Sequence, residues 1–263
     1  MTAAPAHAAR ARSFDAAAAQ YAANRPSYPP ALLDAVEDLA GRPLAGARVV
    51  DVGAGTGIAT ALLAARGARV LAVEPGGGMA EQLRRALPGV PLVRGDGNAL
   101  PLASGTADFL TYAQSWHWTD PARAIPQARR VLRPGGALAL WWNTSPLDVP
   151  WIREQQLRIE RHFRLDTAAE ARAGGRPDTA DPSGSLDFAQ RRVRWSRRVP
   201  LDTHLANIGS HSVFLVQGEE HSRAFLTEER AHLLALFPDG EVEEVYEVSL
   251  LVATTADGSA TTG

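Results

Sequence analysis

Residues 49–59, VVDVGAGTGIA, constrain the fold of this chain more than any other stretch. An apolar run stops at three glycines on alternate positions, Gly53, Gly55 and Gly57, and a helical pattern follows. Glycine permits a backbone with φ above zero and lets a ligand approach without meeting a Cβ atom. A strand, a glycine loop and a helix in this order are typical of nucleotide sites in open α/β sheets, although a tight turn alone would also use glycine.

The spacing of the glycines narrows the type of ligand. A dinucleotide fingerprint places its third Gly or Ala five residues after the first, and Ile58 occupies that position here. The chain also contains no Lys, so it lacks a Tyr-x-x-x-Lys pair. An NAD-dependent oxidoreductase is therefore the weaker alternative within the same type of fold.

Between residues 46 and 143, short apolar runs alternate with Ala-, Leu- and Arg-rich stretches of helical spacing. Such alternation predicts a parallel sheet covered by helices on both faces. Further helices are predicted over 13–25, 31–41, 150–164, 201–209 and 226–237, and further strands over 193–201 and 241–255. The Gly/Pro-rich residues 167–187 predict a flexible loop, and we expect the tails 1–12 and 253–263 to be disordered.

Composition excludes several classes of function. With 263 residues, 45% of them hydrophobic, the chain can form one core with an inserted cap, so we expect a single domain over 13–252. A net charge of −2 gives no basic surface for nucleic acid, and no apolar run is long enough to span a membrane. The first residues carry no apolar signal sequence, and the chain has no Cys. We expect a cytoplasmic monomer or homodimer that binds no metal, membrane or nucleic acid.

Acidic residues end the next two predicted strands. Glu74 ends the second strand, where a carboxylate can accept both hydroxyls of an adenosine ribose and disfavours a 2′-phosphate. Asp96, beside Gly97, ends the third. Each acid alone could be a solvated strand end. Together with the glycine loop, however, the two acids suit an adenosine without phosphates.

Six motifs resemble the class I S-adenosylmethionine-dependent methyltransferases, specifically the small-molecule "type 11" group that includes trans-aconitate methyltransferase-like enzymes. The motifs are YAANRPSYP, VVDVGAGTG, VEP followed by Met79, GDGNALPL, AQSWHW and RRVLRPGGALAL. The resemblance covers roughly residues 13–143. It implies a Rossmann-like, doubly wound, mostly parallel seven-stranded sheet with an antiparallel C-terminal strand. It also implies a cofactor-binding core over 46–143, an N-terminal helical lid, and a small cap over the active site within 144–220.

The resemblance implies S-adenosylmethionine as cofactor and S-adenosylhomocysteine as product. Gly53, Ala54 and Gly55 would pass close to the methionine portion of the cofactor, and Asp51 would support that loop. Glu74 would bind the ribose hydroxyls.

Further residues would enclose the rest of the cofactor. Arg25 is suited to a bidentate grip on the cofactor carboxylate, and Asp96 would hydrogen-bond the adenine amine. The other residues implied in cofactor binding are Tyr21, Pro75, Met79, Gly97 and Gln114.

The loop AQSWHWTD after the fourth predicted strand should face the transferable methyl group. His117 in this loop is the best candidate general base, although a carboxylate acceptor needs no base and the ring could instead order the loop. Tyr28, Trp116 and Trp118 are predicted to contact the substrate, with core packing as the alternative for the two tryptophans. The loop has no Asp/Asn-Pro-Pro-Tyr/Phe signature, which disfavours methylation of an exocyclic nitrogen.

The function predicted from these residues is methylation of a small molecule, most directly at a carboxylate or hydroxyl oxygen. Orientation of the acceptor behind the methyl group can supply most of the acceleration. The alternatives are a C-methyltransferase of a natural-product intermediate and a catalytically silent cofactor-binding partner protein. The histidines outside the loop, His204 and His211 among them, show no metal-ligand spacing and are expected mainly at surface or capping positions, with His211 also a possible liner of the acceptor pocket.

Overall fold

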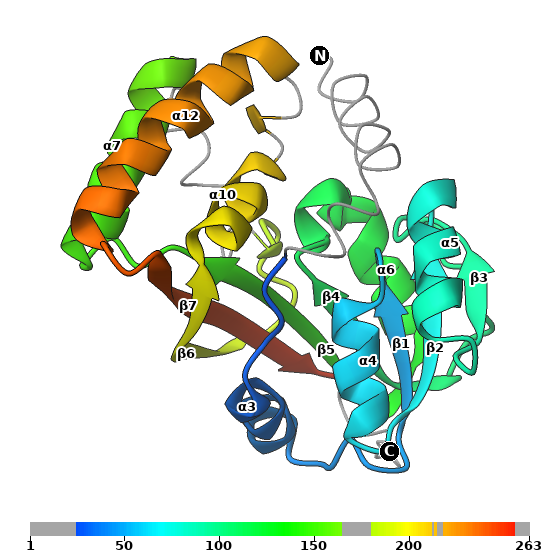
Figure 1. Cartoon of the computed structure of the whole chain (residues 1–263). Helices are drawn as coiled ribbons and strands as arrows, with labels where there is room; N and C mark the ends of the chain where they lie inside the picture. The colour runs from blue at the N-terminus through cyan, green and yellow to red at the C-terminus, as the bar shows by residue number, and fades with distance from the viewer. Residues whose placement is uncertain (1–24, 165–179, 212, 215–217, 256–263) are drawn as a thin grey trace, which may run out of the picture. The chain divides into compact units, whose positions relative to one another are not determined.

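The computed structural model describes residues 25–164, 180–211, 213–214 and 218–255. Within these residues the strands form a seven-stranded sheet of order β3-β2-β1-β4-β5-β7-β6 (Figure 1). Strands β1 to β5 pair in parallel, and the C-terminal strands are antiparallel. The predicted α/β class and sheet are confirmed. The predicted helical lid over 13–24, including Tyr21, and the tail 1–12 lie outside the described residues.

The elements follow the predicted order. The strands are β1 (Arg48–Val52), β2 (Arg69–Glu74), β3 (Leu92–Arg94), β4 (Ala107–Ala113), β5 (Leu132–Thr144), β6 (Ala189–Pro200) and β7 (Glu241–Thr254). The helices are α3 (Pro30–Ala40), α4 (Ile58–Ala65), α5 (Gly77–Ala86), the 3-10 helix η1 (Trp116–Trp118), α6 (Pro121–Val131), α7 (Pro150–Phe163), α10 (Leu201–Gly209) and α12 (Glu219–Leu236). None of the described helices is both long and apolar enough to cross a bilayer.

The chain divides into two compact units. The sheet unit comprises Ser27–Asn143, Ala173–Val193 and Val248–Gly263, and the helical unit comprises Met1–Pro26, Thr144–Arg172 and Arg194–Glu247. The helical unit extends well beyond the cap predicted over 144–220. It does so because Phe225 and Leu233 of α12 belong to the same apolar cluster as Ile159 of α7 and Leu205 of α10.

Helices cover both faces of the sheet unit. Val73 of β2 packs in a cluster with Ile125 and Ala128 of α6, whereas the preceding Ala72 packs in a separate cluster with Leu83 of α5. Consecutive residues of a strand point to opposite faces of a sheet. Helices α5 and α6 therefore lie on opposite faces, as the doubly wound prediction requires.

Local sequence signals fix the helix ends. Helix α3 begins with Pro30 and ends at Ala40, and the next residue, Gly41, has a φ of 62°, the left-handed cap conformation that glycine adopts easily. The Asp120 side chain accepts a hydrogen bond from Ala122 N and so caps the start of α6.

The described part of the predicted flexible loop is more constrained than its composition indicated. The Asp181 carboxylate accepts hydrogen bonds from the backbone of Ser183 and Leu186 and from the Ser185 hydroxyl. Residues 167–179 of that prediction lie outside the described residues. Strand β7 ends at Thr254, close to the end of the strand predicted over 241–255, and so enters the tail predicted as disordered from 253; Ala253 is buried and Thr255 N donates to Gly136 O.

The helical unit encloses a polar cluster that the sequence did not indicate. Arg158 donates two hydrogen bonds to the fully buried Glu229, at 2.6 and 2.7 Å. His204 Nδ1 lies 2.7 Å from Glu244 Oε1. Burial opposes ionisation of Glu244, but His204 and Arg197 outweigh it and lower the pKa of Glu244 to about 2. His204 is only 4% exposed, so its predicted surface or capping position is wrong.

Candidate cofactor site

The glycine loop after β1 adopts a backbone that other residues rarely adopt. Gly53, Gly55 and Gly57 have φ values of 67°, 58° and 93°. A Cβ on Gly53 would lie 2.6 Å from Ser115 Cβ, so this glycine is needed for packing within the protein. A Cβ on Gly55 would meet no atom of the described residues within 4 Å, so among these residues the space in front of Gly55 is open.

Glu74 links this loop to the end of β2. Its Oε2 accepts a hydrogen bond from Gly55 N at 2.7 Å, and its Oε1 accepts one from Gly76 N at 2.6 Å. The side chain is buried. An ionised carboxylate can accept about four hydrogen bonds. A buried carboxylate at this strand end is also the kind of group that can accept hydrogen bonds from ribose hydroxyls.

Asp51 is buried in β1 directly before the glycine loop, and its support of that loop stays a prediction. Its oxygens accept hydrogen bonds from the hydroxyls of Thr60, at 2.6 Å, and Thr111, at 3.0 Å. Complete burial outweighs both hydroxyls and raises the pKa of Asp51 to about 6. Sequence reasoning did not identify the two threonines, because nothing in their spacing marks them as partners of Asp51.

The third strand end is arranged by side-chain contacts. Asp96 is exposed, and its Oδ1 accepts hydrogen bonds from the backbone and side-chain nitrogens of Asn98. Asn98 Oδ1 in turn accepts from Asp120 N at 2.7 Å, so Asn98 ties this loop to the start of α6. Gly97 is buried, and a Cβ there would lie 3.0 Å from Thr119 Cγ2.

The remaining predicted cofactor residues fall into two groups. Pro75 and Met79 follow Glu74 in the sequence and belong to the sheet unit. Pro75 is exposed and Met79 is buried. Ala54 follows Gly53 and is buried in the α5 cluster. Arg25 belongs to the helical unit, where its Nη2 donates to Ser210 O at 3.5 Å, so its grip on the cofactor stays a prediction.

The end of β4 has a strained backbone. Gln114 has a φ of 56°, unusual for a residue other than glycine, and its Nε2 donates to Asn143 O at 3.2 Å. Ser115 Oγ donates to Val52 O at 2.6 Å and so joins this end of β4 to the glycine loop. Strained residues of this kind are frequent at functional sites.

The three aromatic residues of η1 occupy different environments. Trp116 is buried, lies edge-on to Tyr112, and donates from Nε1 to Ala180 O at 3.0 Å, which fits the packing alternative. His117 and Trp118 are partly buried, with ring centroids 4.8 Å apart. Trp142 Nε1 donates to His117 Nδ1 at 3.3 Å, a contact that the sequence did not indicate.

Tyr28, the other predicted substrate residue, precedes α3. It is largely buried, and its ring lies edge-on to Trp141 of β5 with the centroids 6.0 Å apart.

Two buried hydroxyls at this edge have no partner among the described residues. Thr56 Oγ lies within the glycine loop, and Tyr112 Oη lies on β4 next to Gly97. Buried polar groups are normally hydrogen-bonded, so each calls for a further partner. With the open space at Gly55 and the buried carboxylate of Glu74 beside it, the residues fit a polar nucleoside ligand. No group of three or more His, Asp or Glu side chains in the described ranges could hold a metal.

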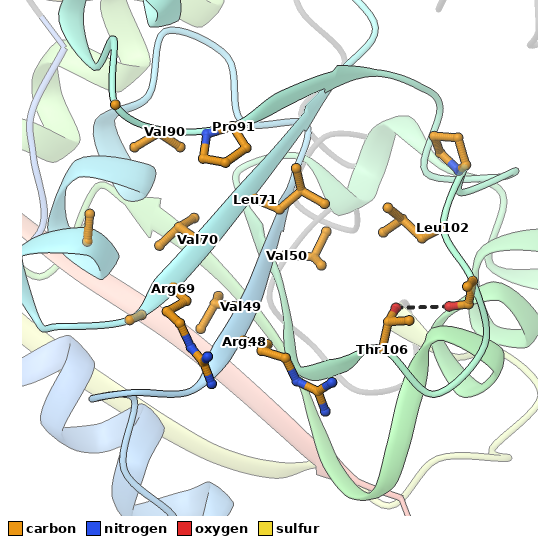
Figure 2. Close-up of a pocket in the computed structure, with 15 residues that line it drawn as sticks. Arg48, Val49, Val50, Arg69, Val70, Leu71, Val90, Pro91, Leu102 and Thr106 are labelled. Carbon is orange, nitrogen blue, oxygen red and sulfur yellow. Dashed lines mark hydrogen bonds between the residues drawn. The ribbon is translucent and has the colours of Figure 1, made fainter.

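A hollow of about 750 Å³ lies at the other end of the strands (Figure 2). Arg48 and Arg69, the first residues of β1 and β2, line it together with Val70 and Leu71. Open α/β sheets bind ligands at the carboxyl ends of their strands. This largely apolar hollow is therefore separate from the candidate cofactor site.

The residues that form this site lie in a part of the chain that resembles a known family. Residues 50–140 match the family model described as a methyltransferase domain. The central part of this chain is thus similar to a class I methyltransferase domain. The cofactor of this class is S-adenosylmethionine, and the oxidoreductase alternative falls away.

The methyltransferase domain has relatives in several bacteria. An uncharacterised methyltransferase of Mycobacterium tuberculosis is 46% identical over 142 residues, which cover 54% of this chain and 56% of the relative. Malonyl-[acyl-carrier protein] O-methyltransferase of Methylococcus capsulatus is 40% identical over 136 residues, 48% of each chain. The matches thus span about half the length of these relatives. The trans-aconitate subgroup stays a prediction.

A solved structure shares the fold over most of the chain. A type II methyltransferase from Anaeromyxobacter dehalogenans superposes with a TM-score of 0.61 at 24% identity, covering 88% of this chain and 97% of its own. At this identity the likeness supports the fold alone.

Proposed function

We propose that this chain is an S-adenosylmethionine-dependent methyltransferase that methylates a carboxylate or hydroxyl oxygen of a small molecule. Glu74 would accept hydrogen bonds from the ribose hydroxyls, and the backbone around Gly55 would line the methionine portion. When bound, the cofactor would supply a sulfonium methyl group that an acceptor oxygen can attack in line, with the sulfur of S-adenosylhomocysteine as the leaving group. The task left to the protein is to hold that oxygen in position and to exclude water.

The observation that carries this proposal is the hydrogen bond from Gly55 N to Glu74 Oε2. It holds the glycine loop and the predicted ribose-binding carboxylate against one another through contacts within the protein itself. A preorganised site of this kind loses little entropy on binding. The name of the Methylococcus relative, an O-methyltransferase, supports oxygen as the acceptor atom.

Two matched glycine variants test the cofactor site. Gly55 and Gly105 both have positive φ, 58° and 66°, and within the part of the chain that the structure describes a Cβ on either would meet no atom within 4 Å. Gly55→Ala and Gly105→Ala should therefore lower stability by similar amounts. Only Gly55→Ala should weaken S-adenosylhomocysteine binding in calorimetry, because its Cβ would enter the space reserved for the cofactor. Equal affinities for both variants, or no binding by the wild type, would overturn the proposal.

Activity needs a separate test, because a catalytically silent partner protein would also bind the cofactor. We expect labelled methyl groups to pass from S-adenosylmethionine to members of a panel of carboxylic acids, alcohols and phenols. Cofactor binding without transfer to any acceptor, including those in a cell extract, would favour the silent partner. A label found on carbon would favour the C-methyltransferase.

A further inference from the structure

The ring of His117 is held by a tryptophan from the neighbouring strand. Trp142 of β5 is buried in the sheet-unit core, and its Nε1 donates to His117 Nδ1 at 3.3 Å. The pairing of Ala113 with Trp141 in the β4–β5 ladder brings Trp142 close to the loop that carries His117. The contact therefore depends on strand register and is part of the fold.

This contact fixes where the imidazole carries its proton. An indole N–H can only donate, so His117 Nδ1 must present a lone pair to it. A neutral imidazole has one protonated and one bare nitrogen, and the proton is then on Nε2. In this tautomer Nε2 has no lone pair with which to take a proton from an acceptor.

The opposite tautomer is disfavoured. A proton on Nδ1 would point at the Trp142 N–H, so two donors would face each other. The buried indole would also lose its acceptor, and leaving such a donor unpaired shifts an equilibrium by roughly tenfold or more. The same penalty opposes the imidazolium that a general base must become.

We propose that Trp142 is a positioning residue that keeps His117 a hydrogen-bond donor, through Nε2–H, and prevents it from acting as the base. This inference rests on the proposed methyl transfer. Because His117 can then only donate, the site selects an acceptor oxygen that is already ionised, as in a carboxylate. A lone pair of that oxygen forms the new C–O bond, the C–S bond breaks with its electrons left on sulfur, and no proton leaves the acceptor. A neutral hydroxyl would need a proton acceptor, which the Nε2–H tautomer of His117 is not.

Imidazole nitrogen NMR of the full chain tests the tautomer without any substrate. In ¹⁵N-labelled wild type, His117 should show a bare Nδ1 and a protonated Nε2, with His117→Asn used to assign the resonances. Trp142→Phe removes the indole donor and should raise the population of the Nδ1–H form. A wild-type ring with its proton on Nδ1 would overturn the proposal. So would a tautomer population that does not change in a folded Trp142→Phe variant.

Two His117 variants test the role in transfer. In His117→Gln the side-chain amide nitrogen reaches about as far as Nε2 and keeps a donor there. In His117→Asn the shorter side chain can still accept the hydrogen bond from Trp142 Nε1, but it no longer places a donor at the position of Nε2. We expect KM for the acid substrate to rise roughly tenfold in the Asn variant and by about threefold or less in the Gln variant. The shape of the pH–rate profile should be the same in His117→Gln as in the wild type.

The acceptor panel pairs linear and aromatic carboxylic acids with the matching alcohols and phenols. Methylation of acids alone is the expected result. Methylation of alcohols or phenols alone would overturn the proposal, as would an equal loss of kcat in the two His117 variants. Failure to methylate any acid by a chain that binds S-adenosylhomocysteine would also overturn it. Absence of S-adenosylhomocysteine binding, by contrast, refutes the proposed function itself and is distinguishable by calorimetry.

Discussion

The backbone N–H of Gly55 donates to Glu74 Oε2 at 2.7 Å and so joins the ends of β1 and β2. The other oxygen of the same carboxylate accepts from Gly76 N at the start of α5. One side chain therefore shapes the glycine loop and also faces the predicted ribose position. Changes at Glu74 should act on stability and on cofactor affinity together.

Replacement of Glu74 by Ala should weaken S-adenosylhomocysteine binding by about 1–3 kcal/mol, because buried ribose hydroxyls would lose their acceptor. It should also lower the melting temperature, because the N–H groups of Gly55 and Gly76 would lose theirs. Glu74→Gln keeps the size and one acceptor oxygen, so both effects should be smaller. Calorimetry and thermal melts of the two variants check this, and unchanged affinity in both would show that the ribose lies elsewhere.

Burial of Asp51 should make stability fall as pH rises. Its pKa is raised in the folded chain from 3.8 to about 6, so between these values the folded chain binds more protons than the unfolded chain. The stability that Asp51 contributes is then greatest below about pH 4 and is lost as pH rises through about 6. Asp51→Asn should remove this component in urea unfolding measured across pH 4–7. Parallel pH curves for the variant and wild type would contradict the prediction.

The buried ion pair of the helical unit should be costly to break. Arg158 holds Glu229, which is 0% exposed, so Arg158→Met would leave an uncompensated buried carboxylate and cost about 3–5 kcal/mol of unfolding free energy. Arg85 pairs with Glu81 at the surface, with side chains 67% and 51% exposed, so Arg85→Met should cost about 0.5 kcal/mol or less. Denaturant unfolding of the two variants provides the comparison, and similar losses would contradict it.

Alanine at position 53 should destabilise the protein more than alanine at a glycine position that has open space around it. Gly53 and Gly41 have similar φ values, 67° and 62°, but among the described residues only a Cβ on Gly53 meets another residue, Ser115 Cβ at 2.6 Å. Gly53→Ala should therefore be less stable than Gly41→Ala by about 1–3 kcal/mol, the usual cost of overpacking. Adding Ser115→Gly should recover part of the difference. Equal melting temperatures for the two alanine variants would show that the loop moves aside without cost.

The sequence predicted most of the elements because their signals are local. Apolar runs of strand length, helical spacing between them and glycines at turns need no knowledge of the fold. The predicted strand over 193–201 corresponds to β6, and the helix predicted over 201–209 corresponds to α10. The helix predicted over 226–237 begins earlier, at Glu219, because polar residues in its first turns hid the helical pattern.

Side-chain pairs between distant segments could not be predicted in this way. The Trp142–His117 contact depends on the register of β4 against β5, and the support of Asp51 by Thr111 depends on the register of β1 against β4. Buried polar pairs such as Arg158 with Glu229 look like solvated surface charges in a one-dimensional pattern. Only the tertiary structure shows that these side chains are buried and that each therefore needs a hydrogen-bond partner.

The amino-acid sequence alone determined the alternation of strands and helices and the placing of glycines and acids at successive strand ends, because those features are set by residues adjacent in the chain. Tertiary structure decided which groups those residues meet. Strand pairing places an indole N–H against one nitrogen of His117 and a glycine N–H against Glu74, and such contacts set the proton position and geometry on which the proposed chemistry depends.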